Sequence, residues 1–186
     1  MKLALSLIAT LTLLLALSVA PPASAAVSRA SICPGAFAAP SQANLASLRT
    51  TTVCLLNLER RKRGMRALRA NGRLQAAADR HASDMVRREY FSHQSQSGAS
   101  FVDRILGAGY VSPSQAWSLG ENIAYGTGRL ATPAAIVASW MRSPGHRANI
   151  LKRSFTEIGV GIAIGDPNDG SDFRGGTYAT DFGRRG

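Results

Sequence analysis

The segment from Phe155 to Ile164 constrains the fold more than any other stretch of the chain. Its apolar side chains fall at every second position, and the positions between them carry almost no side chain: Ile158, Val160, Ile162 and Ile164 alternate with Gly159, Gly161 and Ala163. A period of two predicts a β-strand. Because one face of this strand is nearly bare, another backbone can approach it closely.

Helices are predicted before this strand, and a second strand after it. Helical spacing indicates helices over residues 43–63, 71–88, 101–106 and 132–142. Asn71, Ser100 and the Thr132-Pro133 pair are typical helix starts, and Gly64 is a typical stop. Residues 177–182 can return beside the first strand as a hairpin. Helices early and strands late predict an α+β fold, with helices covering an antiparallel sheet.

The first residues have the features of an export signal. A lysine precedes an almost wholly apolar run, and small residues follow a Pro-Pro break, so we expect residues 1–25 to be a signal peptide. Residues 26–42 are then a flexible leader, and residues 43–186 form one domain. Export places Cys33 and Cys54 in an oxidising compartment, where a disulfide is expected. We expect a secreted monomer without a membrane-spanning segment once the signal is removed.

The chain is strongly basic, with a formal charge of +11. Such a charge predicts attraction to polyanions. The densest group of cations runs from Arg60 to Arg69 at the end of the first helix, where a solvated face is expected. Nucleic acid is not the expected partner, because no aromatic stacking pattern or nucleic-acid motif accompanies the charge.

Three histidines and one carboxylate are the candidates for chemistry. His146 follows the Ser143-Pro144-Gly145 break and is displayed at the turn or in the first turn of a new short helix. His93 follows the second helix in the same way. His81 lies on the apolar stripe of that helix, which predicts a packed core histidine. Glu121 sits between apolar residues and is expected at a break between elements. It must be partnered or functional, because an unpaired buried charge is costly.

Several segments together resemble one family, and they occur in this order: Asn57-Leu58-Glu59-Arg60, Phe91-Ser92-His93, Asp103-Arg104-Ile105, Gly120-Glu121-Asn122-Ile123-Ala124, Ser143-Pro144-Gly145-His146-Arg147, Ile158-Gly159-Val160-Gly161 and Asp181-Phe182-Gly183. The chain resembles the bacterial branch of the CAP superfamily, the SCP-like extracellular domains related to cysteine-rich secretory proteins, antigen 5 and plant pathogenesis-related proteins. The resemblance implies a three-layer α-β-α sandwich with a central antiparallel sheet. It also implies a cleft of two histidines and two glutamates.

This resemblance assigns His93, Glu121 and His146 to the cleft and places Ser143 where the family has its second glutamate. His81 matches no cleft position. His93 and His146 could ligate a divalent cation such as zinc. Glu121 could instead hydrogen-bond one of the rings and raise its basicity, or act as a base itself.

Three functions are open to such a chain. The incomplete tetrad favours a ligand-binding domain of the cell envelope with little or no catalytic activity, whose partner is a lipid, a wall polymer or a protein. The second possibility is a metal-assisted hydrolase of peptide or glycan with Glu121 as base. The third is a basic binder of wall polymers or other polyanions with an inert cleft.

Overall fold

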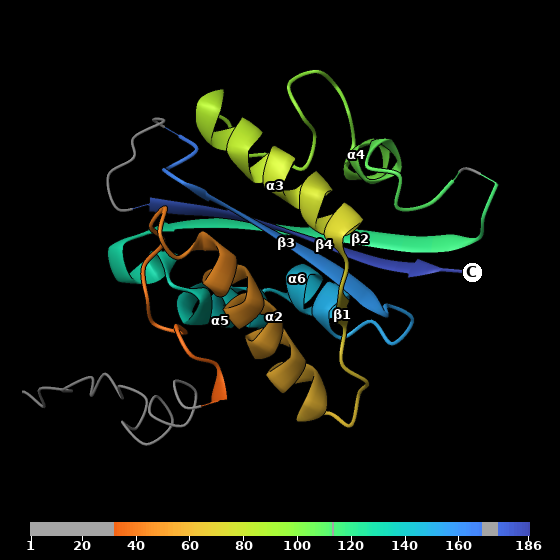
Figure 1. Cartoon of the computed structure of the whole chain (residues 1–186), viewed down its shortest axis with the longest axis horizontal. Helices are drawn as coiled ribbons and strands as arrows, with labels where there is room; N and C mark the ends of the chain where they lie inside the picture. Colours follow the sequence, from red (N-terminus) through yellow and green to blue (C-terminus); the bar gives the residue numbers. More distant parts are fainter. Residues whose placement is uncertain (1–31, 113, 169–174) are drawn as a thin grey trace, which may run out of the picture.

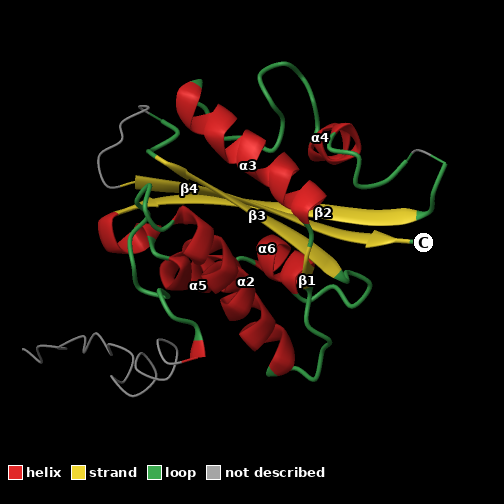
Figure 2. Ribbon diagram, in the orientation of Figure 1, coloured by secondary structure: helices red, strands yellow, loops and turns green. Residues whose placement is uncertain are grey.

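A four-stranded sheet lies between two layers of helices (Figure 1). The computed structural model describes residues 32–112, 114–168 and 175–186. The strands, in the spatial order β1-β3-β4-β2, are β1 (Arg69–Ala70), β3 (Glu157–Ile164), β4 (Gly175–Arg185) and β2 (Trp117–Thr127). Helices α3 (Gly72–Arg87) and α4 (Phe101–Gly107) cover one face, and α2 (Leu45–Arg61), α5 (Pro133–Arg142) and α6 (Pro144–Ile150) cover the other (Figure 2). The α-β-α sandwich is therefore confirmed.

The bare face of β3 receives helix α3, as predicted. A Cβ atom on Gly159 would overlap the backbone of Leu74 and Gln75, and one on Gly161 would overlap the backbone of Ala78. The glycines thus allow α3 to lie directly on the sheet. The apolar face of β3 packs the other way, into the core formed with α2, α5 and α6.

The predicted helices form with nearly the expected ends. The side chain of Asn71 accepts hydrogen bonds from two backbone N–H groups of α3, and Ser100 and Asp103 form a reciprocal capping box on α4. Thr132 caps α5, which ends at Arg142 because Pro144 begins the next helix. Helix α2 is followed by Gly64 at φ +64°, a conformation that favours glycine.

Two details of the predicted sheet were wrong. The short β1 pairs with β3 in parallel, so the sheet is mixed, although β2, β3 and β4 are antiparallel to their neighbours. Glu121 does not lie at a break between elements. It is the fifth residue of β2, an eleven-residue strand that the short, glycine-flanked segment did not suggest.

The predicted solvated cluster at the end of α2 also needs a correction, because Arg60 is only 1% exposed. Its guanidinium donates four hydrogen bonds, all to backbone carbonyls, of Arg66, Ile150, Lys152 and Phe155. These bonds tie the loop after α2 to the loop before β3. The other cations of the cluster are exposed, as expected.

A disulfide between Cys33 and Cys54 fastens the segment before α2 to that helix, as predicted. The predicted signal peptide, residues 1–25, and the beginning of the leader, residues 26–31, lie outside the described residues. Within the described ranges, none of the helices has the length and apolar character needed to cross a bilayer.

Candidate functional site

The residues that were predicted to form a cleft lie on and beside β2, at an edge of the sheet. Among the described strands, β2 pairs only with β4, so residues from both faces of the sheet can approach its other edge. His93 comes from the loop after α3, and His146 comes from α6 on the opposite face. Glu121 lies on the strand between them. The fold thus brings three of the predicted residues to one edge.

Glu121 is buried and fully engaged. Its side chain is 1% exposed. One carboxylate oxygen accepts a hydrogen bond from His93 Nδ1 at 2.8 Å, and the other lies 2.6 Å from an Nη atom of Arg104. Both oxygens therefore have strong, charge-assisted partners inside the protein.

The bond to Glu121 orients the ring of His93. Because a carboxylate only accepts hydrogen bonds, Nδ1 carries the proton, and Nε2 is left as the acceptor of the neutral ring. The His93 side chain is 52% exposed, so this ring can meet a ligand. Beside it, Phe91 and Tyr125 form an edge-to-face pair at 4.9 Å, and both rings are partly exposed. Exposed aromatic surface therefore lies on the strand and on the loop that carry Glu121 and His93.

Arg104 holds this arrangement together. From α4 it donates to the carbonyl oxygens of His93 and Ala99 and to Ser95 Oγ, in addition to its ion pair with Glu121. One guanidinium thus fixes both the loop that carries His93 and the carboxylate that orients it. The sequence showed Arg104 only as part of a segment that resembles the family, and this role was not predicted.

His81 is buried, as predicted, but it also borders the site. Its Nε2 donates to the carbonyl oxygen of Ser92 at 2.9 Å and lies 4.0 Å from a carboxylate oxygen of Glu121. Burial lowers the pKa of His81, with the charge of Glu121 opposing that shift and the charge of Arg104 adding to it. The neutral ring therefore forms part of the buried surroundings of the Glu121 carboxylate.

Asp181 is the residue that sequence reasoning missed most clearly. It lies on β4 directly opposite Glu121 and is 1% exposed. Among the described residues, neither of its carboxyl oxygens has a hydrogen-bond partner. Burial raises the pKa of Asp181 well above its ordinary value, and the adjacent charge of Glu121 raises it further. A carboxylate inside an apolar strand was the available signal, and only the register placed it against Glu121.

His146 and Ser143 lie on the other side of the edge. His146 is in the first turn of α6, and its carbonyl oxygen accepts a hydrogen bond from Asn122 on β2. Burial lowers the pKa of His146, and the influence of His93 lowers it further. Ser143 is the N-cap residue of α6, but its side chain makes no capping bond to the helix.

The donor set fits a metal ion only weakly. In the described ranges, no three His, Cys, Asp or Glu side chains are grouped so that they could hold one. Two imidazoles are fewer protein ligands than zinc sites normally have. If His93 bound a metal through Nε2, Glu121 would accept the hydrogen bond from Nδ1, as carboxylates commonly do from a metal-bound histidine.

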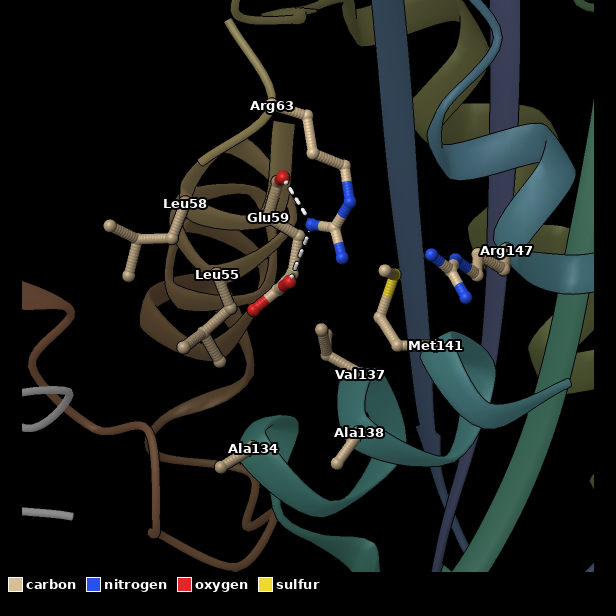
Figure 3. Close-up of a pocket in the computed structure, with 9 residues that line it drawn as sticks. All are labelled: Leu55, Leu58, Glu59, Arg63, Ala134, Val137, Ala138, Met141 and Arg147. Atoms are coloured by element: carbon tan, nitrogen blue, oxygen red, sulfur yellow. Dashed lines mark hydrogen bonds and ion pairs between the residues drawn. The ribbon is translucent and has the colours of Figure 1, made fainter. Parts of the chain in front are cut away.

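A cavity of about 260 Å³ lies between α2 and α5 (Figure 3). Its walls are largely apolar, with Leu55, Val137 and Met141 facing it. At its end lie Arg147 and Arg63, and Arg63 is paired with Glu59 at 3.0 Å. The groove thus combines an apolar floor with a cationic end.

The three-layer α-β-α sandwich is the fold that the resemblance to SCP-like domains implied. Comparison of the sequence agrees with this: residues 53–180 match the family described as "CAP: Cysteine-rich secretory protein family". The chain belongs to that family.

A relative and two solved structures are also similar to the chain. The chain is 42% identical over 107 residues to the "Uncharacterized protein YkwD" of Bacillus subtilis. The aligned residues make up 58% of this chain and 39% of that protein. An extracellular protein of Bacillus anthracis containing an SCP domain has a similar structure, with a TM-score of 0.61, 24% identity and coverage of 77% of this chain and 43% of that one. An outer surface protein of Borrelia burgdorferi gives a TM-score of 0.60 at 18% identity, covering 74% and 92%. These two structures are similar in fold.

Proposed function

We propose that this chain is a secreted domain that binds a ligand of the cell envelope and has little or no catalytic activity. The observation that carries this proposal is the state of Glu121, whose two oxygens are occupied by His93 and Arg104 inside the protein. A general base must reach the proton that it removes. A carboxylate that is 1% exposed and bonded to a guanidinium is poorly suited to that task.

Among the described residues, we infer that Glu121 has no second carboxyl group placed as a hydrolase would need. Ser143 stands where the family has its second glutamate, and Asp181 is buried on β4 opposite Glu121. Glycoside hydrolysis requires two carboxyl groups on either side of the scissile bond. The oriented ring of His93 and the exposed rings of Phe91 and Tyr125 are features of a binding surface.

Enzyme assays test the absence of catalysis. The purified protein is incubated with labelled wall fragments and with casein, beside a Glu121→Gln variant. We expect no turnover above background for either protein. Turnover by the wild type that disappears in Glu121→Gln would contradict the proposal and support the hydrolase.

The cleft is also proposed to take a divalent cation weakly, through His93 and His146. Zinc should then raise the melting temperature of the wild type and not that of a His93→Ala/His146→Ala double variant, because ligands stabilise only the state that binds them. Equal shifts in both proteins would remove this site. Ser143→Glu restores the family's fourth residue, and tighter zinc binding by this variant would show that position 143 faces the same ligand space.

The groove between α2 and α5 supports an amphiphile as the envelope ligand. A short alkyl chain matches its apolar floor, and an anionic head group matches Arg147 (Figure 3). Dansyl-labelled undecanoic acid is a suitable probe. Ala138→Phe fills the groove and should weaken binding about tenfold or more, since an anchor without its pocket loses well over 1 kcal/mol.

The matched control is Ser139→Phe, which adds the same ring at an exposed position of α5 that does not line the groove. This variant should bind the probe as the wild type does. Equal binding by all three proteins would show that the probe binds elsewhere.

A further inference from the structure

A basic groove lies at the end of α2, and none of His93, Glu121 and His146 lines it. It has a volume of about 690 Å³ and is bounded by the loop from Gly64 to Arg69 and the loop from Arg153 to Thr156. These loops lie at the same end of the molecule, next to β1 (Figure 1). Every charged residue that lines the groove is an arginine: Arg60, Arg66, Arg69 and Arg153.

The buried member, Arg60, leaves its positive charge without a compensating acid. All four of its hydrogen bonds go to neutral carbonyl oxygens. In the part of the chain that the structure describes, no carboxylate lies within 4.0 Å of its guanidinium. An unpaired buried charge is costly, and an anion in the groove would offset that cost.

Three further guanidinium groups are available to a ligand above this floor. Arg66 and Arg153 are exposed, and the Arg69 side chain is 78% exposed, with its nearest carboxylate, Glu157, 3.9 Å away. Guanidinium groups bind phosphate oxygens in a bidentate manner. The bonds of Arg60 to both loops hold the walls in place, so the groove is largely preformed.

The composition of the groove favours phosphate without bases. Its one aromatic ring, Phe155, is only 1% exposed and is stacked on Phe182 at 5.5 Å. Binders of single-stranded nucleic acid place bases on exposed aromatic rings, which this groove lacks. We propose that the groove formed by Arg60, Arg66, Arg69 and Arg153 binds a linear phosphodiester polymer that carries no bases. This site is independent of the ligand and metal proposed above.

A synthetic glycerol-phosphate oligomer is the probe, and binding is measured by calorimetry with the full domain at several salt concentrations. An Arg66→Ala/Arg69→Ala/Arg153→Ala variant should bind about tenfold more weakly or worse. The slope of log K against log salt should fall by about 2, because each phosphate contact on a single strand contributes roughly 0.7. Arg60 is kept, so that the fold is not disturbed.

The matched control removes the same charge elsewhere. Arg80, Arg129 and Arg142 are exposed and line no part of the groove, and their triple alanine variant should bind nearly as the wild type does. Equal losses in the two triple variants would show a general effect of net charge and overturn the proposal. Absence of binding by the wild type at low salt would do the same.

Two further measurements keep the outcome decisive. If the groove triple variant does not fold, Arg153→Glu changes a single exposed residue and should still weaken binding; wild-type affinity for this variant would refute the site. Oligo(dT) with the same number of phosphates should bind no more tightly than the glycerol-phosphate oligomer. Tighter binding of oligo(dT) would instead indicate a nucleic-acid site.

Discussion

Replacing Asp181 by asparagine is expected to make the protein more stable relative to the wild type at neutral pH than at acidic pH. Asp181 is buried opposite Glu121, and neither of its oxygens has a hydrogen-bond partner among the described residues. Burial is the main reason that its pKa is raised, and the charge of Glu121 adds to it. Asparagine has nearly the same shape and cannot ionise, so it resembles the protonated form of the native side chain.

The direction in which the stability of the wild type changes with pH follows from the raised pKa of Asp181. Between the pKa of the unfolded chain, near 3.8, and the higher pKa of the folded protein, the folded state holds a proton that the unfolded state has lost. In this range, the stability of the wild type falls as the pH rises, by at most about 1.4 kcal/mol per pH unit for one proton. Above the folded pKa the loss is complete and constant. The Asp181→Asn variant lacks this loss.

Urea unfolding at a series of pH values from about 4 to 8 measures the effect. The difference in unfolding free energy, variant minus wild type, should rise with pH with a slope approaching one proton. Asp103→Asn is a control of opposite sign. Hydrogen bonds from Ser100 lower the pKa of Asp103, so its contribution is present at neutral pH and is lost as the pH falls. A difference for Asp181→Asn that stays constant over the whole range would refute the reasoning.

Three other variants test the fold through their unfolding free energies in urea. Gly161→Ala should destabilise the folded protein by about 3 kcal/mol or more, because its Cβ would overlap the backbone of α3. In Gly145→Ala the new Cβ meets open space, so this control should be nearly neutral. Equal effects of the two substitutions would contradict the close packing of α3 on the sheet. Arg60→Met should destabilise the folded protein by about 3 kcal/mol or more, since each buried carbonyl left without a donor costs about 1–3 kcal/mol. A neutral result would mean that the hydrogen bonds of Arg60 contribute little to stability. A Cys33→Ala/Cys54→Ala variant should lose about 3 kcal/mol for a link of 21 residues, and reductant should lower the stability of the wild type without changing that of the variant.

Local patterns were sufficient where a structural requirement is local. The cap at Asn71 and the proline-induced end of α5 depend on backbone groups a few residues away, so their residue types predict them. The alternation around Gly159 and Gly161 likewise predicted both a strand and the close approach of another backbone. The short β1 and the full length of β2 escaped notice because pairing with distant strands, rather than local periodicity, creates them.

By itself, the sequence determined the helices, the hairpin of β3 and β4 and the candidates His93, Glu121 and His146. Only the tertiary structure decided what surrounds Glu121, because Arg104, His81 and Asp181 come from three different elements and no spacing relates them. The physical reason is that the low polarity of a buried site couples charges across the fold. The neighbours of a buried carboxyl group in space therefore decide how readily it ionises.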